Sequence, residues 1–366
     1  MVRLSAALVA ALSLAGGLTF AQATTPYKLG TFELQGRTFV GLVVGDTTVI
    51  DIALADKAVP AQKRLAMPTD MKDLIARYDS GLRGRFQELV AASRTGGSSS
   101  AGRSPLSAVK ILPPILYPTT MLNAAVNYRE HGAEVVRRDA KGAAPAPAAT
   151  APGDALPGTQ SAPGLWERKP GDTRWNPYLF LKASSAVIGE GEAIRIPPGR
   201  TQIDWECELG VVIGRTASRV STEAARDHIF GYTLEQDISD RGGRGDTRHG
   251  SDWFVGKSHD TFAPMGPFIV PKEFVKDIQK VPVRFTLNGT VMQDADTSLM
   301  IHSVDELVAY GSSILTLRPG DVIATGSPAG VGSARTPPIF LKAGDRTVCT
   351  YEGIGTLTNP VQATPR

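Results

Sequence analysis

The clearest alternation of apolar and polar positions lies between residues 204 and 214. The sequence there, Asp-Trp-Glu-Cys-Glu-Leu-Gly-Val-Val-Ile-Gly, predicts one β-strand, because successive side chains of a strand point to opposite faces. One face is apolar, and its burial would set the register of the strand. The other face carries the carboxylates of Asp204, Glu206 and Glu208. Adjacent like charges repel, so this face indicates either a divalent cation with oxygen ligands or a solvated acidic surface.

The N-terminal pattern predicts a small β-plus-helix domain over residues 24–95. Short alternating segments at 28–34, 37–44 and 47–52 are separated by Gln-Gly and Gly-Asp turns, which is typical of a β-meander. Apolar residues at helical spacing predict a helix over 71–93; these are Leu74, Tyr78, Leu82, Phe86 and Leu89. The Gly- and Ser-rich stretch that follows indicates a flexible linker, which we place at 96–108.

Residues 109–366 form a second, larger unit that is rich in strands and poor in long helices. A hairpin is predicted around Asn288-Gly289, and a helix over 303–314 opens with Ser303 and Glu306 in a capping-box pattern. The pattern predicts a β-dominated α+β fold. An Ala- and Pro-rich insertion at about 138–175 cannot bury a core of its own, and we expect it to be either an inert surface loop or part of a lid.

The first 23 residues resemble a secretory signal peptide rather than part of the fold. Arg3 precedes an apolar run over 4–18, and Ala21-Gln22-Ala23 is a small-x-small cleavage site. An uncleaved anchor is the alternative, but the apolar run is short for a membrane span. We therefore expect a periplasmic or secreted protein, with no stable membrane insertion after cleavage.

Composition changes this picture little. Of the 366 residues 42% are hydrophobic and 20% charged, and the net charge is only +3, without a basic run, so a nucleic-acid partner is not expected. The two cysteines, Cys207 and Cys349, lie in a chain expected in an oxidising compartment, where a disulfide is permitted. We nevertheless favour two free, buried thiols over a bridge, since sequence alone does not bring the two residues together.

Several further segments carry polar residues in recognisable order. They are Asn-Tyr-Arg-Glu-His-Gly-Ala-Glu (127–134), Phe-Leu-Lys (180–182), Gln-Asp-Ile-Ser-Asp-Arg (236–241), Gly-Lys-Ser-His-Asp-Thr-Phe (256–262) and Gly-Asp-Val-Ile-Ala-Thr-Gly-Ser-Pro-Ala-Gly-Val-Gly (320–332). Together with the acidic strand, this order resembles the fumarylacetoacetate hydrolase family over roughly residues 114–361. The resemblance implies a mixed β-roll catalytic domain, a homodimer and, with the leader, an exported bacterial member.

The resemblance also implies a metal site at Glu206, Glu208 and Asp237. Three hard oxygen ligands suit Mg²⁺, or else Mn²⁺ or Ca²⁺, whereas zinc and copper normally recruit His or Cys. Asp204 is a candidate for a water-mediated or supporting contact.

The remaining candidates would act on the substrate. His131 and Glu134, three apart on a predicted helix, share one face, so they are either a general-base pair that activates water or a surface ion pair. Lys257 would stabilise an enolate. The resemblance assigns substrate contacts to Tyr128, Lys182, Arg241 and Thr325.

These residues predict a metal-dependent hydrolase that cleaves a carbon–carbon bond in 2,4-dioxo acids of the acylpyruvate type. Isomerisation of a 2-hydroxy-dienoate and decarboxylation of a 2-oxo acid remain open on the same site, because fold and metal do not determine the reaction. A non-catalytic periplasmic binding protein for 2-oxo acids is the alternative from another class.

Overall fold

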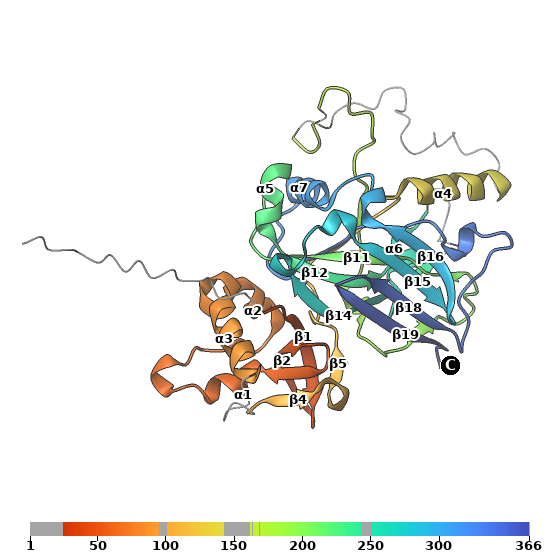
Figure 1. Ribbon diagram of the computed structural model, residues 1–366. Helices are drawn as coiled ribbons and strands as arrows, with labels where there is room; N and C mark the ends of the chain where they lie inside the picture. The colour runs from red at the N-terminus through yellow and green to blue at the C-terminus, as the bar shows by residue number, and fades with distance from the viewer. Residues whose placement is uncertain are drawn as a thin grey trace, which may run out of the picture.

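The structure is a computed structural model that describes residues 25–94, 101–142, 162, 164–167, 169–243 and 251–365. The predicted signal segment and residues 143–161, half of the predicted insertion, lie outside the described residues. Figure 1 shows the elements up to β5 gathered at one side, and the remaining strands and helices α4–α7 at the other.

The N-terminal elements contain the predicted meander. Strands β1 (Lys28–Leu34), β2 (Arg37–Val44) and β3 (Thr48–Asp51) pair antiparallel in sequence order. The predicted helix over 71–93 is instead interrupted, because Gly81 has a φ of 108° within the π-helical turn Tyr78–Leu82. The helical segments of this part are α1 (Ile52–Lys57), the 3₁₀ turn Ala61–Lys63, α2 (Met71–Arg77) and α3 (Arg83–Arg94).

Part of the predicted linker is a strand rather than a flexible connection. β4 (Arg103–Pro105) pairs with β3, and β5 (Lys110–Leu112) pairs with β1. The segment returns to the sheet because Asp51 donates its backbone N–H to the carbonyl of Gly102 at 2.8 Å.

A single twelve-stranded sheet runs through both parts of the chain. Its order is β4-β3-β2-β1-β14-β12-β11-β17-β6-β7, with β5 beside β1 and β8 beside β14. β1 and β14 pair antiparallel at Leu29 and Ile269, which joins the N-terminal meander to the larger unit. The strands of the larger unit in this sheet are β6 (Met121–Ala124), β7 (Leu179–Leu181), β8 (Val187–Ile188), β11 (Cys207–Ile213), β12 (Ile229–Gln236), β14 (Ala263–Pro271) and β17 (Val322–Ala324).

A five-stranded sheet, in the order β16-β15-β18-β19-β9, packs against β11 and its neighbours. Its strands are β9 (Ile194–Ile196), β15 (Pro282–Leu287), β16 (Thr290–Asp296), β18 (Arg346–Tyr351) and β19 (Gly355–Ala363). The predicted hairpin is confirmed: Asn288 and Gly289, with φ of 53° and 83°, turn β15 into β16. Between the sheets the rings of Trp205 and Phe285 stack with centroids 5.6 Å apart.

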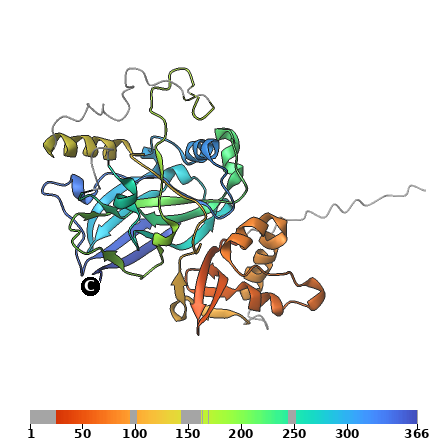
Figure 2. The same ribbon diagram turned by 180° about the vertical axis from the view of Figure 1, so that it is seen from behind.

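The helices of the larger unit are few, which confirms the prediction of a β-dominated α+β fold. Among the described residues they are α4 (Arg129–Gly142), α5 (Thr222–Ala225), α6 (Trp253–Lys257) and α7 (Val304–Ile314), with short 3₁₀ turns at Ser184–Ala186, Arg226–His228, Lys272–Phe274, Ile278–Lys280, Thr297–Leu299 and Gly332–Ala334. A further 3₁₀ turn, Leu106–Ala108, lies in the predicted linker. α7 begins with the predicted capping box of Ser303 and Glu306. Seen from behind in Figure 2, α4, α5 and α7 lie along one side of the sheets. Among the described residues, the helices are too short or too polar to cross a membrane.

The prediction of two free cysteines is wrong. Cys207 on β11 and Cys349 on β18 form a disulfide with their Cα atoms 5.5 Å apart. Both residues are buried, as expected, but the stacking of the two sheets brings positions 142 residues apart in sequence into contact. This proximity comes from the tertiary packing, which the strand pattern does not specify.

The predicted acidic strand is also divided. β10 (Ile203–Asp204) pairs with β13 (Ser239–Asp240), and β11 resumes at Cys207. Trp205 and Glu206 lie at the break, where the carbonyl of Glu206 accepts a hydrogen bond from the N–H of Asp237 at 2.9 Å. The strand paired with it is likewise interrupted: Asp237 lies between the end of β12 and the start of β13.

Candidate active site

Three carboxylates meet where the two neighbouring strands are interrupted. Glu206, Glu208 and Asp237 each have an oxygen within 4.8 Å of the others, and all three side chains are buried. Glu208 lies on β11 and Glu206 just before it, two positions earlier, and the backbone N–H of Asp237, just after β12, donates to the carbonyl of Glu206. The sequence therefore named a real cluster, although Glu206 and Asp237 lie at breaks rather than within a continuous strand.

Three predicted cationic side chains contact this cluster. Lys257, at the end of α6, donates to Glu206 Oε2 at 2.7 Å and also to Asp237. Lys182, which follows β7, donates to Asp237 and to the carbonyl of Ile238. Arg241 donates to Glu206 Oε1 at 2.5 Å and to Asp204 Oδ2 at 3.0 Å. Although burial opposes it, Arg241 and Lys257 hold the pKa of Glu206 well below its usual range.

Glu235 is a buried carboxylate that the sequence analysis missed. Its Oε2 accepts from Asn123 Nδ2 at 3.3 Å, and its Oε1 lies 3.9 Å from Lys182 Nζ. Glu235 precedes Asp237 by two positions on one chain, so strand alternation predicts that both face the same way. That spacing was the signal available in the sequence.

The charges of this cluster fit a bound dication. Five buried carboxylates (Asp204, Glu206, Glu208, Glu235 and Asp237) face three cations (Lys182, Lys257 and Arg241), so with every group ionised the named residues would carry two excess negative charges. Burial and the neighbouring carboxylates of Asp237, Glu235 and Glu206 raise the pKa of Glu208 well above its usual value. A divalent cation among the three clustered oxygens would neutralise this excess.

The predicted His–Glu pair lies at the edge of the cluster. His131 and Glu134 are on the first turns of α4, with His131 Nδ1 3.5 Å from Glu134 Oε2. The other ring nitrogen, Nε2, lies 3.7 Å from Glu206 Oε1. Both oxygens of Glu134 accept from the backbone N–H of Gly330 at 3.0 Å. The pair is therefore not a solvated surface ion pair: the imidazole is buried and lies between Glu134 and the carboxylate cluster.

The loop after β17 also reaches the cluster. The N–H of Gly326 donates to Glu208 Oε2 at 2.8 Å, and Thr325, which is fully buried, donates its N–H to the carbonyl of Leu209. Asp204 holds the far end of the same loop, because its carboxylate accepts from the backbone N–H groups of Gly332 and Ser333. Asp204 thus holds both Arg241 and the end of this loop in place.

Asn127 is a second residue whose role the sequence did not indicate. Its side-chain amide donates to the carbonyls of His302 and Thr325, each at 2.9 Å, and its Oδ1 accepts from the N–H of His302 at 2.8 Å. These bonds join the segment before α4 to the segment before α7 and to the Thr325 loop. The next residue, Tyr128, is fully buried, and burial raises the pKa of its hydroxyl.

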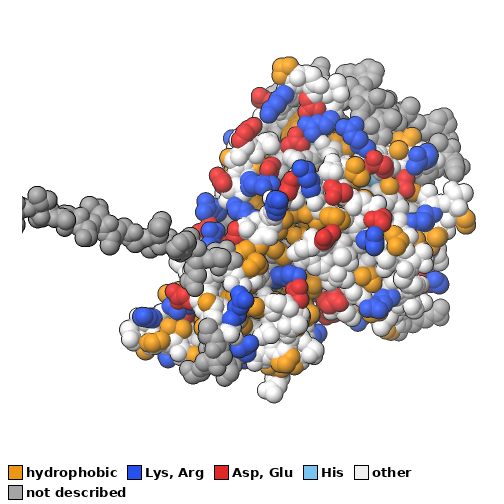
Figure 3. All heavy atoms as spheres, in the orientation of Figure 1, with side chains coloured by type: hydrophobic (Ala, Val, Ile, Leu, Met, Phe, Trp, Pro, Cys, Tyr) orange, Lys and Arg blue, Asp and Glu red, His pale blue; other side chains and the backbone are white. Residues whose placement is uncertain are grey.

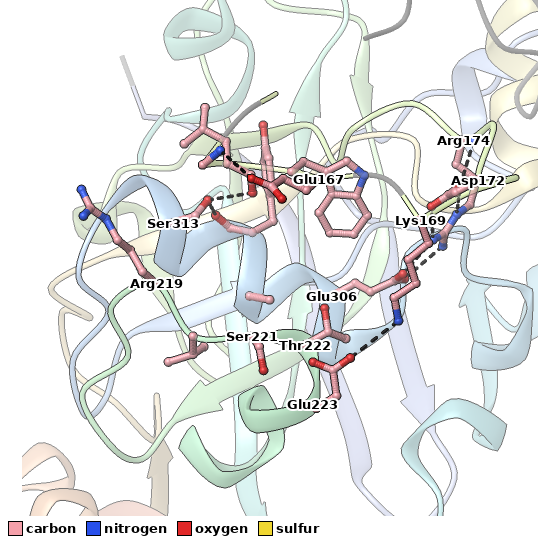
Figure 4. Close-up of a pocket in the computed structure, with 16 residues that line it drawn as sticks. Glu167, Lys169, Asp172, Arg174, Arg219, Ser221, Thr222, Glu223, Glu306 and Ser313 are labelled. Atoms are coloured by element: carbon pink, nitrogen blue, oxygen red, sulfur yellow. Dashed lines mark hydrogen bonds and ion pairs between the residues drawn. The ribbon is translucent and has the colours of Figure 1, made fainter. Parts of the chain in front are cut away.

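A separate cavity of about 540 Å³ lies on the outer side of α7 (Figure 4). It is lined by Lys169, Arg174, Glu223, Glu306 and their neighbours, and by none of the predicted site residues. The described end of the predicted insertion forms one wall of this cavity, where Arg174 makes a bidentate ion pair with Glu306. A lid function for the insertion stays a prediction.

A β-dominated fold that buries carboxylates, lysines and a histidine in one place, with a half-buried glutamate beside the imidazole, has the features of an enzyme. Residues 120–362 match the family described as fumarylacetoacetate (FAA) hydrolase C-terminal, and the chain belongs to this family.

Two relatives illustrate how far the similarity extends. The chain is 33% identical to oxaloacetate tautomerase YisK of Bacillus subtilis over 336 residues. This alignment covers 91% of this chain and 99% of that protein. It is 40% identical over 185 residues to the mitochondrial oxaloacetate tautomerase fahd2 of Xenopus laevis, a match that spans 50% of this chain and 58% of that relative.

Among solved structures, the maleylpyruvate hydrolase of Sphingobium sp. SYK-6 has a similar fold. The two structures align with a TM-score of 0.65 and 27% identity over 92% of this chain and 100% of that one. That structure is a complex with a manganese(II) ion and pyruvate.

Proposed function

We propose that this protein is a divalent-metal-dependent enzyme that converts 2-oxo acids through their enolates, with keto–enol tautomerisation of an oxaloacetate-like diacid as its principal reaction. The observation that carries the proposal is the meeting of three buried carboxylates with Lys257 and the His131–Glu134 pair. The similarity to an oxaloacetate tautomerase over nearly the whole chain supports this reaction among those open to the site.

Glu206, Glu208 and Asp237 would hold the ion, and Mg²⁺, Mn²⁺ or Ca²⁺ suits their oxygen ligands. When bound, the ion supplies positive charge that favours the enolate form of a 2-oxo acid. The manganese and pyruvate in the structurally similar hydrolase are consistent with this choice of ion and substrate class.

The protein's own groups would move the proton and bind the substrate. His131 Nε2, on the side of the carboxylate cluster, accepts the proton from the carbon next to the ketone and returns it to the enolate oxygen. Glu134, fixed by the N–H of Gly330, holds the opposite nitrogen, Nδ1, and keeps the ring in orientation. Lys257 stabilises the developing negative charge, while Tyr128, Lys182, Arg241 and Thr325 are the proposed substrate contacts.

Hydrolysis of the carbon–carbon bond in 2,4-dioxo acids is the second candidate. The geometry of the His131–Glu134 pair favours it, because a buried imidazole backed by a fixed carboxylate is suited to deprotonate water. The same active site would serve isomerisation of a 2-hydroxy-dienoate or decarboxylation of a 2-oxo acid, which require enolate stabilisation without activated water. A binding protein for 2-oxo acids would need the metal cluster but no proton-transfer pair.

A substrate panel tests the proposal. Enol-oxaloacetate, an acylpyruvate, a 2-hydroxy-dienoate and oxaloacetate for decarboxylation are assayed with Mn²⁺, with Mg²⁺ and after chelation. We expect metal-dependent loss of the enol as the fastest reaction. Fastest turnover of the acylpyruvate would favour the hydrolase, and binding without turnover across the panel would contradict an enzymatic function.

We also propose export to an oxidising compartment, most simply a periplasm. The leader-like pattern of residues 1–23 and the buried disulfide support this location, because disulfides persist where thiols are oxidised. The mature chain should then begin at Thr24. Mass spectrometry of the protein from its native host checks this, and a full-length cytosolic chain would contradict it.

The proposed partners are a small-molecule acid and a second copy of the chain, without nucleic acid. On the face shown in Figure 3, described acidic and basic side chains are interspersed rather than gathered into one basic surface, which is consistent with the low net charge.

A further inference from the structure

The disulfide lies between two of the proposed metal ligands. Cys207 separates Glu206 from Glu208, and strand alternation turns its side chain to the face opposite the two carboxylates. On that face Cys207 is bonded to Cys349 of β18, and both residues are fully buried.

The five-stranded sheet holds Cys207 at three atoms. The backbone N–H of Cys207 donates to Gln293 Oε1 at 3.2 Å, and its carbonyl accepts from the hydroxyl of Tyr351 at 3.3 Å. The third attachment is the bond between the sulfurs of Cys207 and Cys349, which is the only covalent one. The ligand end of β11 is therefore tied to the opposite sheet at one residue.

Glu208 depends on this attachment more than the other ligands do. Glu206 contacts Lys257 and Arg241, and Asp237 contacts Lys182 and Lys257. Among the described residues, Glu208 forms no ion pair, and its carboxylate accepts a hydrogen bond from the N–H of Gly326 at 2.8 Å. Its position is thus determined chiefly by the backbone of β11.

We propose that the Cys207–Cys349 disulfide positions Glu206 and Glu208 for metal binding, so that the oxidised chain binds a divalent ion more tightly than the reduced chain. This inference rests on the proposed metal site. Two thiols do not approach each other as closely as two bonded sulfurs, so opening the bond moves β11 relative to β18 and takes the two glutamates with it. The metal centre then reaches its full affinity only after the chain has been oxidised.

The redox step is a thiol–disulfide exchange. A dithiol reductant breaks the S–S bond, Cys207 and Cys349 each take up one electron and one proton, and the reductant becomes its own disulfide. A disulfide donor in the oxidising compartment carries out the reverse reaction.

Because of thermodynamic linkage, the coupling between the disulfide and the metal can be measured either as a change in metal affinity or as a change in the reduction potential of the disulfide. The factor by which the disulfide tightens metal binding equals the factor by which the metal stabilises the disulfide against reduction. A tenfold coupling lowers the reduction potential of this two-electron couple by about 30 mV.

The first measurement compares metal affinities without any reductant. Mn²⁺ is titrated calorimetrically into the full oxidised protein, into Cys207→Ala/Cys349→Ala, and into Val361→Ala. The last is a matched control, because Val361 is buried in the same core on β19 and its truncation leaves the disulfide intact. We expect the dissociation constant for Mn²⁺ to rise about tenfold in the double variant and to stay within about twofold in Val361→Ala.

The second measurement uses the unmodified sequence. It therefore tests the coupling between the disulfide and metal binding even if the double variant does not fold. The disulfide is equilibrated with dithiothreitol buffers, with and without saturating Mg²⁺, an ion for which thiols are poor ligands. We expect Mg²⁺ to shift the midpoint of reduction to lower potential.

Two negative outcomes are distinguishable. Equal metal affinity of the oxidised and disulfide-free chains, together with an unchanged midpoint, would overturn the positioning role alone. Failure of the oxidised protein to bind either ion would overturn the proposed metal site as well.

Discussion

At the scale of single residues, the three proposed ligands have unequal surroundings. Glu206 lies against Arg241 and Lys257, which lower its pKa against the effect of burial. The pKa of Glu208 is instead raised by burial and by the neighbouring carboxylates. The protein's own cations therefore neutralise Glu206 better than Glu208. A divalent ion would remove this difference, because it attracts both carboxylates in their charged forms.

Removing one ligand charge should weaken metal binding. Asp237→Asn keeps the size of the side chain but loses a negative charge, so we expect divalent-metal affinity to fall at least tenfold, about 1.4 kcal/mol or more. Asp294→Asn, on the exposed face of β16, is the matched control. Calorimetric titration with Mn²⁺ checks the prediction, and equal affinities in the two variants would exclude Asp237 as a ligand.

Replacing the proposed base should affect proton transfer but not the metal. In His131→Gln we expect kcat for the tautomerase or hydrolase reaction to fall by about 10² to 10⁴, the usual contribution of a positioned general base. Mn²⁺ affinity should stay within a few-fold, since His131 is not among the three ligands. Any decarboxylase activity, which rests on enolate stabilisation, should be less affected. His228→Gln, on the 3₁₀ turn after α5, serves as the control. An unchanged kcat in His131→Gln would show that His131 is not the general base.

At the scale of elements, the start of α7 connects the surface to the site. Arg174 donates to the carbonyl of Ile301 and to Glu306, the residue that completes the capping box with Ser303. The N–H of Ile301 donates in turn to the carbonyl of Asn127, whose side chain contacts Thr325. The helix start, the outer cavity and the Thr325 loop are therefore joined by one continuous series of hydrogen bonds.

The buried His302 at this helix start should make stability depend on pH. Burial and the charge of Arg174 lower its pKa from 6.5 to about 4, so the unfolded chain binds this proton more readily than the folded chain. Its contribution to stability is present above about pH 6.5 and is lost as the pH falls towards 4. We expect a loss of about 2 kcal/mol between pH 7 and pH 5 from this group.

Urea unfolding of the wild type and of His302→Gln at both pH values measures this contribution. The variant should lose less stability on acidification than the wild type, whatever its stability at pH 7. Equal losses of stability between pH 7 and pH 5 in the two proteins would show that His302 does not cause the pH dependence.

At the scale of the whole molecule, the disulfide and the continuous sheet tie distant segments together. Cys207 and Cys349 close a loop of 142 residues, which contributes about 5 kcal/mol in a chain-entropy model of disulfide stabilisation. The pairing of β1 with β14 extends the large sheet through both predicted domains. The meander thus packs as part of the same structure that carries the site.

An exposed apolar surface beside the site is the proposed contact between two copies of the chain. Tyr178 and Leu181, at the ends of edge strand β7, and Phe254 on α6 are 52%, 64% and 73% exposed. Such clustered apolar side chains at a sheet edge are typical of an association surface. We expect the protein to be a dimer in light scattering, and Phe254→Glu to shift it towards the monomer. Val291→Glu, on β16 at the edge of the five-stranded sheet, should remain dimeric; a monomeric wild type would contradict the homodimer.

Local patterns of the sequence determined the fold class of this protein, its principal hairpin and part of its candidate site. Strand alternation, the Asn-Gly turn and the capping box of α7 depend on neighbours along the chain, so the β-dominated fold and its principal hairpin could be predicted. The same alternation placed Glu206 and Glu208 on one face. The resemblance to a family added Asp237, Lys257 and the His131–Glu134 pair, which the structure brings together.

The tertiary structure alone decided which distant residues meet. The disulfide, the contact of Lys182 with Glu235 and the bridging role of Asn127 join segments that lie far apart in the sequence. The breaks at Glu206 and Asp237 arise because the chain leaves the large sheet there to form the β10–β13 pair. Periodicity reports which face of a strand is buried, but not which element covers that face, and this is why the cysteine pairing could not be predicted.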